Sequence, residues 1–423
     1  MKKILFIHPF FPYPLVSGGH QALFNGILAV KDDYDIYLAY EAWEGEEYNK
    51  AEKDFLERIP NVHLLPLVHK SKKPTLKERV AGKCRRIIKQ VFLIKDNLPI
   101  HNENERLGKA WISTITPQNE KTTEHIQTLF KKYSFDIVQV EMPWLVSHVL
   151  SLPKNVKKVY VHHELGFVKR NLEMNERQES SYLNACKKFA DINEIALLNQ
   201  YDAVITLSDV DKEKLIRHGV NVPVETSLAV IDQTDETTII TIAKKRLTFV
   251  GLENHTPNLV GITWFLDYCW KKLLNIQPDY QLDIIGYWSM EKRKEYEEKY
   301  PHVRFLGYVN DLGEALQGSV MIVPITIGSG IRMKILEACS HGIPFVSTSV
   351  GAEGIHVISG EHCFIADQPD EFVSSILKLQ DTSLQSRFAR NAKAFIENNY
   401  SISALKANRL QIYENLLTQN VNN

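Results

Sequence analysis

Short apolar runs alternate with helical patterns along most of the chain, and this alternation limits the possible folds more than any other feature. Such an order is typical of parallel α/β sheets. The first half contains the candidate strands Lys3–His8, Asp35–Tyr40, Val62–Pro66, Ile137–Glu141, Lys158–His162 and Ala203–Ser208. A second series comprises Leu247–Gly251, Gln281–Gly286, Val303–Gly307, Val320–Pro324, Pro344–Thr348 and Cys363–Ala366. We therefore predict an α/β protein with two doubly wound parallel sheets.

The segment between the two series indicates where one domain ends and the next begins. Glu225–Lys245 is rich in Thr and Asp and has no helical period, so we interpret it as a connection. It separates an N-terminal domain at 1–225 from a second domain at 245–400, and the length of 423 residues is ample for two cores. The tail Ile402–Leu417 has apolar residues at helical spacing, but spacing alone does not identify the surface it packs on.

Composition excludes several classes of protein. With 44% apolar and 24% charged residues the chain is neither disordered nor fibrous. Lys and Arg number 50 against 51 Asp and Glu, so no overall basic excess points to nucleic acid. The five Cys are scattered without a CxxC pair, which excludes a disulfide framework and a Cys-based zinc site. No apolar run reaches the ~20 residues of a membrane span. We expect a cytoplasmic protein, soluble or peripheral at the inner face of a membrane.

One segment, 70–95, departs from the balanced charge of the chain. It contains ten Lys or Arg against a single acid, Glu78, and its apolar residues form a stripe at helical period. Such a helix can pack on its own domain, lie on an anionic membrane or near a lipid-linked acceptor, or bind nucleic acid. The first two interpretations are the stronger, and a peripheral membrane contact through 70–95 is a prediction.

Two glycine-rich loops follow strands, at the sheet edge where α/β proteins bind ligands. In the first loop, Gly18 and Gly19 stand where the next helix must start, so a substrate can approach the backbone amides. An ordinary strand-to-helix turn explains this loop equally well. The second loop contains Gly328-Ser-Gly330 and leads into an expected helix over Ile331–His341, with Gly342 as its left-handed C-cap.

The second loop carries the stronger signal, because two cations occupy the expected first turn of its helix. Arg332 and Lys334 there are each disfavoured by ~0.3–1 kcal/mol through the helix dipole, which makes sense if a phosphate binds. Glu337, one turn later, can chelate a vicinal diol. The alternative is a solvated Lys334–Glu337 pair on the helix surface.

With these loops in place, Thr248–Gly354 resembles the nucleotide-binding half of GT-B glycosyltransferases, specifically retaining family 4 and its relatives. The matching pieces are Phe249–Gly251, His255–Asn258, Leu282–Gly286, Val303–Asp311, Ile331–Glu337 and Pro344–Thr348. The resemblance implies two Rossmann-like domains facing a central cleft, with the C-terminal helix 400–423 crossing back onto the first domain. It also implies a nucleotide-sugar donor and an acceptor-side loop at Gly18 and Gly19.

Residue by residue, the resemblance implies that Glu337 holds the donor ribose, with the backbone of Gly330 and Ile331 facing the diphosphate and sugar. The chain departs from the family at two points. Ser329 stands where the first Glu of a paired motif is usual, and Gly251 is followed by Leu-Glu-Asn where Arg and Lys often occur. We infer that Arg332 and Lys334 supply the missing charge. The expected donor-binding set is Gly251, Ser329, Gly330, Ile331, Arg332, Lys334 and Glu337.

Catalytic candidates follow the strand at Lys158–His162, where the family places a His, often beside a carboxylate. His162, His163 and Glu164 occupy these positions. Neighbours at a strand end point to opposite faces, so we expect His163 rather than His162 to face the cleft. Glu141, at the end of the preceding strand, is a further candidate, and a loop His without chemical role is the alternative. No His spacing indicates a metal site, so neither metal nor cofactor is expected beyond the nucleotide sugar.

These features together predict a glycosyltransferase that moves a sugar from a nucleotide sugar to an acceptor hydroxyl, in glycan or polysaccharide biosynthesis. Retention is implied by the resemblance alone. Two alternatives remain open: a catalytically silent partner that binds sugar nucleotide or glycan, favoured by Ser329, and a nucleotide-sugar epimerase on the same fold. The expected partners are a nucleotide-sugar donor and a glycan or lipid-linked acceptor, not nucleic acid.

Overall fold

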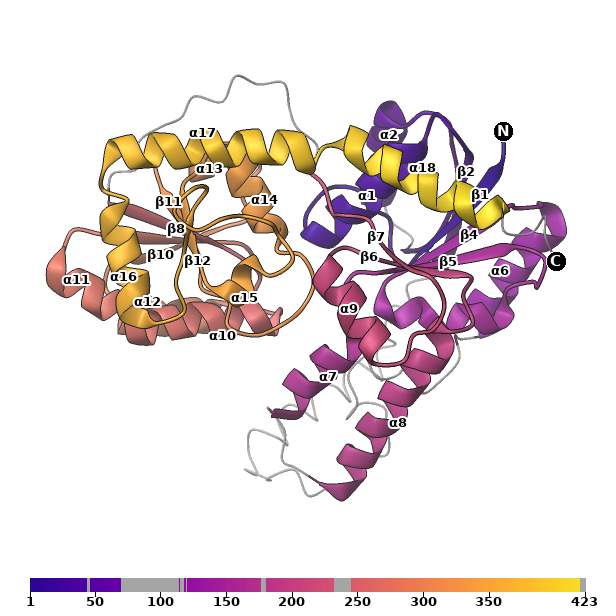
Figure 1. Ribbon diagram of the computed structural model, residues 1–423, viewed down its shortest axis with the longest axis horizontal. Coiled ribbons are helices and arrows are strands. Elements are labelled where there is room, and N and C mark those ends of the chain that lie inside the picture. The colour runs from indigo at the N-terminus through magenta and orange to yellow at the C-terminus, as the bar shows by residue number, and fades with distance from the viewer. Residues whose placement is uncertain are drawn as a thin grey trace.

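The computed structural model describes residues 1–43, 46–69, 114, 118, 120–175, 180–231 and 245–418. These residues form two α/β domains side by side, each built on one parallel sheet with helices on its faces (Figure 1). The basic segment 70–95 lies outside the described residues. None of the described helices is long and apolar enough to span a membrane.

The N-terminal sheet has seven parallel strands in the order β3-β2-β1-β4-β5-β6-β7. They are β1 Lys3–His8, β2 Asp35–Trp43, β3 Val62–His69, β4 Ile137–Glu141, β5 Lys157–His162, β6 Ala203–Thr206 and β7 Val224–Thr226. The chain reverses its direction of winding between β1 and β4, which pair through Ile4↔Ile137. A ligand site is therefore expected at the carboxyl ends of these two strands.

Helices cover both faces of this sheet because its strands are apolar on both sides. Within β1, Ile4 and Phe6 face one core while Leu5 and Ile7 face the other. Among the described residues the helices are α1 Gly18–Val30, α2 Glu46–Arg58, α6 Glu120–Lys132, a 3-10 helix at Pro143–Ser151, α7 Gly166–Asn175, α8 Ser181–Leu198 and α9 Asp209–Arg217. Of these, α7 and α8 project away from the body of the domain (Figure 1).

The C-terminal sheet has six parallel strands in the order β10-β9-β8-β11-β12-β13. They are β8 Arg246–Val250, β9 Gln281–Ile285, β10 Val303–Gly307, β11 Val320–Val323, β12 Phe345–Ser347 and β13 Phe364–Ile365. All twelve strands predicted from the sequence are confirmed, with ends within three residues of those expected. The short β7 is an addition, because it overlaps the start of the segment Glu225–Lys245 that was interpreted as connection.

The helices of this domain include α14, which follows the second glycine-rich loop. They are α10 Thr256–Trp264, a π-helix at Phe265–Trp270, α11 Lys271–Ile276, α12 Met290–Lys299, α13 Leu312–Leu316, α14 Met333–Ser340, α15 Ser349–Ala352, α16 Pro369–Lys378 and α17 Thr382–Asn399. The expected helix Ile331–His341 is thus wrong at its start, because Arg332 is the N-cap residue rather than part of the first turn. Its predicted end is confirmed: Gly342 has φ +61° just after the C-cap.

The last helix leaves the second domain and lies on the first. After α17 the chain turns at Tyr400 and continues as α18, Ile402–Thr418, which packs against α1 (Figure 1). Its buried face consists of Leu405, Arg409, Ile412, Tyr413 and Leu416. The domains are therefore linked twice, once after β7 and once through α17 and α18.

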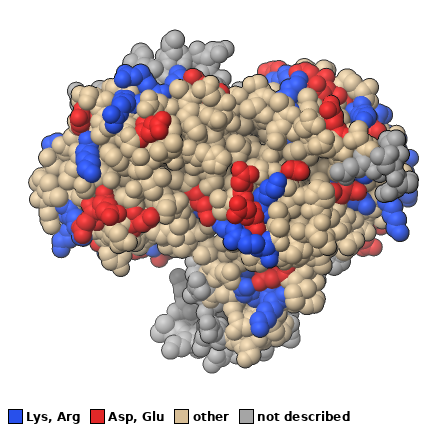
Figure 2. All heavy atoms as spheres, viewed as in Figure 1, with Lys and Arg blue, Asp and Glu red and all other residues tan. Residues whose placement is uncertain are grey.

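Charged side chains do not gather into a single-sign region on the face shown in Figure 2. Lys and Arg alternate there with Asp and Glu between broad uncharged areas. This agrees with the formal net charge of -1 for the whole chain.

Candidate functional site

The second glycine-rich loop meets the first domain directly. The Leu165 backbone N–H donates to Ser329 Oγ at 3.1 Å. Gly330 has φ +78°, and a Cβ there would lie 2.6 Å from the His163 carbonyl oxygen. Both the left-handed backbone and this close approach require glycine. The expected donor loop and the end of β5 are consequently in contact across the seam between the domains.

Glu337 lies on this seam and is 9% exposed. Its Oε1 accepts a hydrogen bond of 2.5 Å from Gln21 Nε2, on α1 of the opposite domain. His341, one turn along α14, places its Nε2 3.7 Å from Glu337 Oε2. The carboxylate expected to hold a ribose therefore joins the two domains in this conformation. A ribose diol would have to replace Gln21.

Arg332 is buried at the N-terminus of α14, with 7% exposure. Its Nη1 donates to the carbonyls of Ser329, at 2.7 Å, and Gly330. Its Nε and Nη2 are buried without a hydrogen-bond partner among the described residues. Burial lowers the pKa of this guanidinium, while Glu353, Asp211 and Glu164 act in the opposite direction. A buried cation with two unused donors is suited to an anionic ligand.

Lys334 is half-buried and is not paired with Glu337. Its Nζ donates to Asn258 Oδ1 at 2.7 Å and lies 4.7 Å from the centre of the Phe249 ring. Burial, together with the nearby charge of Arg332, lowers the pKa of Lys334 to about 7. The alternative of a solvated Lys334–Glu337 surface pair is therefore wrong.

The remaining expected glycines also lie at close contacts. A Cβ on Gly18 would meet Met333 Cγ at 2.7 Å, so α1 begins against the start of α14. Ser17 caps α1 through its side chain, so the predicted helix start at Gly18 and Gly19 is confirmed. Gly251 abuts the Asn258 side chain that holds Lys334. The half-buried Ile331 lies beside Gly354.

The two neighbouring histidines have different surroundings, as the alternation along a strand predicts. His163 Nε2 lies 2.7 Å from Glu141 Oε2, and His8 Nε2 lies 3.5 Å from Glu141 Oε1. Burial raises the pKa of Glu141, but its interactions with His163 and His8 outweigh burial and hold this pKa well below its usual range. Glu141 is therefore ionised, and His163 donates its Nε2–H to it.

His162 points instead into a buried ionic cluster. Its Nε2 lies 3.1 Å from Glu194 Oε1, and Glu194 also pairs with Arg170. Arg170 Nε donates to Asp191 at 2.7 Å, and the Gly166 N–H donates to Glu194 at 3.1 Å. These contacts attach α7 and α8 to the end of β5. They suit a structural role for His162 rather than one at the cleft.

Glu164 lies at the seam and is half-buried. Its Oε2 accepts a hydrogen bond of 3.0 Å from Lys169 Nζ. It is close enough to influence the charge state of both Arg332 and His255. Lys169 of the first domain and Arg332 and Lys334 of the second are likewise close enough to influence the charge state of His255.

Sequence reasoning missed Gln21 and His8. Gln21 stands in the first turn of α1, just after Gly18 and Gly19, but its contact partner Glu337 is 316 residues away. His8 ends β1, next to β4 in the sheet, and the strand order needed to place it beside Glu141 is not visible in the sequence. The sequence feature that could have indicated the His8–Glu141 contact is that a polar residue ends each of the two strands, β1 and β4.

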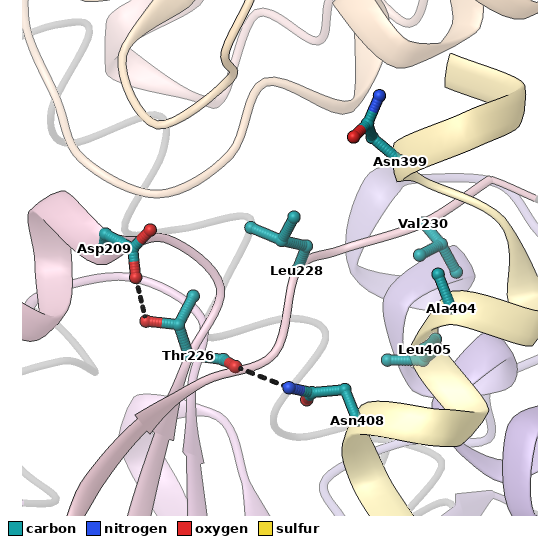
Figure 3. A pocket seen from close by; sticks show the side chains of 8 residues that line it. All are labelled: Asp209, Thr226, Leu228, Val230, Asn399, Ala404, Leu405 and Asn408. Atoms are coloured by element: carbon teal, nitrogen blue, oxygen red, sulfur yellow. Dashed lines mark hydrogen bonds between the residues drawn. The ribbon is translucent and has the colours of Figure 1, made fainter. Parts of the chain in front are cut away.

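A pocket of about 280 Å³ lies away from this seam, at the double link between the domains (Figure 3). Thr226 Oγ1 donates to Asp209 at 2.6 Å at one side, and Asn408 donates to the Thr226 carbonyl at 3.2 Å. The pocket is lined by Asp209, Thr226, Leu228, Val230, Asn399, Ala404, Leu405 and Asn408. It contains none of the expected donor or catalytic residues.

The chain resembles known proteins, both over its second domain and over its whole length. Residues 244–382 match the family "Glycosyl transferases group 1". An uncharacterized 44.6 kDa protein in the cps region of Klebsiella pneumoniae is 24% identical over 420 residues, which cover 95% of this chain and 97% of that protein.

Solved structures of similar fold cover nearly the whole chain. Sucrose-phosphate synthase from Thermosynechococcus elongatus is 14% identical with a TM-score of 0.67, covering 99% of this chain and 100% of that chain. A point mutant of S. aureus TarM, in complex with Fondaparinux, alpha-GlcNAc-glycerol and UDP, is 12% identical with a TM-score of 0.67, covering 98% of this chain and 100% of that chain. Anabaena HepE with UDP-glucose is 13% identical with a TM-score of 0.63, covering 99% and 100%.

These likenesses show the architecture of the whole chain, whereas the family match covers the second domain. The chain has the two-domain α/β fold named GT-B, and its residues 244–382 match the glycosyl transferases of group 1.

Proposed function

We propose that the protein is a retaining glycosyltransferase that moves a sugar from a nucleotide-sugar donor to an acceptor hydroxyl of a glycan or lipid-linked glycan, in polysaccharide biosynthesis. The family match and the GT-B fold support sugar transfer. The complexes of HepE with UDP-glucose and of TarM with UDP support a nucleotide-sugar donor. The Klebsiella relative in the cps region supports a polysaccharide pathway.

One observation carries the proposal: the loop before α14 meets the end of β5 across the seam. Arg332, Glu337 and the first amides of α14 lie on one side, and the His163–Glu141 pair lies on the other. The N-cap residue Arg332 makes no side-chain cap hydrogen bond, so these amides are not occupied by a cap. Phosphate chemistry and hydrogen bonding to hydroxyls are thereby supplied by opposite domains.

The proposed mechanism places the leaving diphosphate at the N-terminus of α14. Negative charge grows on this group as the glycosidic bond breaks. Arg332, Lys334 and the helix amides would stabilise that charge, and preorganised donors of this kind lower the barrier more than they tighten substrate binding. Glu337 would hold the ribose after Gln21 is displaced.

His163 would act on the hydroxyl side of the reaction. Because its Nε2–H is donated to Glu141, Nδ1 is left as a hydrogen-bond acceptor for a hydroxyl of the donor sugar or the acceptor. Contact between the domains would exclude water, which otherwise hydrolyses the donor. We expect this chemistry to proceed without a metal, and therefore to continue in the presence of a chelator.

A panel of nucleotide sugars offered to the purified protein tests the proposal. Release of nucleoside diphosphate, with and without candidate glycan acceptors, identifies transfer or slow donor hydrolysis. NMR of the product's anomeric signal distinguishes retention from inversion. The same assay on Glu337→Ala is the control, because turnover should be lost with the ribose contact. Absence of both binding and turnover across the panel would contradict the proposal.

Ser329 favours one alternative, the catalytically silent partner. Its hydroxyl accepts the Leu165 N–H, so it serves the contact between the domains where the family's first Glu would be. A silent partner would bind a nucleotide sugar in the same panel without breaking it down in the presence of any acceptor.

A further inference from the structure

A chain of buried hydrogen bonds runs from the C-terminal helix α18 to the His163–Glu141 pair. It starts at Arg409 and Tyr413, one turn apart on α18 and 4% and 0% exposed. Arg409 Nη1 donates to Gln139 Oε1 at 3.2 Å, and the Tyr413 hydroxyl donates to the same oxygen. Gln139, on β4, is fully buried.

The side-chain amide of Gln139 also contacts Glu141. Its Nε2 donates to Glu141 Oε1 at 2.5 Å, while Glu141 Oε2 accepts from His163. The two residues are two apart on β4, so their side chains share a face of the sheet. Because two donors on α18 fix the amide oxygen of Gln139, its NH₂ group can point only toward Glu141.

The two ends of this hydrogen-bond network carry opposite buried charges. Arg409 is a cation, Glu141 is an anion, and the Gln139 amide dipole lies between them with its oxygen toward the cation and its N–H toward the anion. Arg409 is also tied to Ser227 through its Nε at 2.8 Å. In a low-dielectric interior such a fully bonded network has one favourable arrangement, and loss of one member leaves its neighbours unpaired.

We propose that Gln139, held by Arg409 and Tyr413 of α18, is a positioning residue that fixes the orientation of Glu141 and thereby the tautomer of His163. The seating of α18 on the first domain therefore sets the geometry of the reaction centre. The role assigned to His163 in catalysis rests on the proposed glycosyltransferase function. The link from α18 to the His163 tautomer does not.

The test measures His163 directly, by ¹⁵N NMR of the full chain, with its signals assigned by their loss in His163→Gln. Wild type should show the Nε2–H tautomer. Gln139→Leu removes the donor to Glu141, and Tyr413→Phe removes a hydroxyl without changing ring packing. Each should reduce the population of the His163 Nε2–H tautomer. If Gln139→Leu fails to fold, Tyr413→Phe carries the test.

Asn408→Ala is the matched control, because it also removes a bond of α18 to the first domain without reaching Gln139. It should leave the His163 signals as in wild type. Unchanged signals in Gln139→Leu, or equal shifts in Asn408→Ala, would overturn the proposal.

Kinetics separate this inference from the proposed function. For an active enzyme, Gln139→Leu should lower kcat roughly tenfold, with nucleotide affinity unchanged. If the protein has no transferase activity but Gln139→Leu still shifts the His163 signals, the link from α18 to the His163 tautomer is supported and the proposed function is rejected. A variant that loses nucleotide affinity as much as kcat would reject the positioning role.

Discussion

If Glu337 holds the donor ribose as proposed, Gln21 competes with the donor for it, so removing Gln21 should tighten nucleotide binding. The Gln21–Glu337 hydrogen bond spans 2.5 Å and involves a largely buried carboxylate. Bonds to charged groups contribute about 1.5–3 kcal/mol net. A ligand that must break this contact loses that amount, and the lower value corresponds to about a tenfold weaker apparent affinity. Gln21→Ala is therefore expected to bind UDP about tenfold more tightly or more.

Isothermal titration calorimetry with UDP measures this change. Gln411→Ala, an exposed substitution on α18, should leave the affinity unchanged. Glu337→Ala should weaken binding by roughly 10- to 150-fold, and Gln21→Ala should have no further effect in that background. Weaker binding in Gln21→Ala alone would refute the reasoning, because Gln21 would then contact the nucleotide instead of blocking it.

Three further predictions concern charge and catalysis. The pKa of Lys334 is lowered to about 7, so Lys334 loses its proton as pH rises through this value. Calorimetry should then show UDP affinity falling between about pH 6 and pH 8.5 while uridine affinity stays constant, and Lys334→Gln should flatten the UDP curve. His163→Ala should reduce turnover by about 10²-fold or more without weakening UDP binding, whereas greater damage from His162→Ala would reverse their assigned roles. The basic segment 70–95 should bind anionic vesicles at low salt and release them as salt rises, since surface attraction is screened within ~8 Å at physiological salt. Gln at Lys83, Arg85, Arg86 and Lys89 should abolish vesicle binding but not UDP binding, and indifference of wild type to vesicles would contradict this role.

The strands could be predicted because each is indicated by an apolar run within its own short segment of sequence. Ile4–Ile7 is buried on both faces, and an unbroken run of this kind has few alternatives to a parallel strand. The short β7, Val224–Thr226, carried no such run and was missed. The start of α14 was misplaced by two residues, since the Arg332 side chain bonds back to its own loop and ends up as the N-cap.

Those features of the candidate site that lie within a single loop or helix could be predicted from the sequence, whereas the contacts between distant segments could not. The loop with Gly330 and the helix with Glu337 follow from local sequence and a family resemblance. The contacts of Glu337 with Gln21 and of Glu141 with His8 depend on strand order and on how two domains meet. The spacing of residues along the chain does not reveal the strand order or the way in which the two domains meet. The sequence also left open whether Lys334 pairs with Glu337, and burial beside Phe249 and Asn258 decides it.

The placement of α18 has a consequence for how the protein is made. Tyr413 and Ile412 complete the core over α1, and the ring of Tyr413 packs against Tyr34 with centroids 5.5 Å apart. The ribosome reaches Ile402 only after translating the entire second domain. At about 5–20 residues per second, the first domain waits roughly 10–35 s after β7 emerges before its last helix arrives. During that interval its apolar α1 surface is uncovered, so chaperone binding to nascent chains should end when α18 is synthesised.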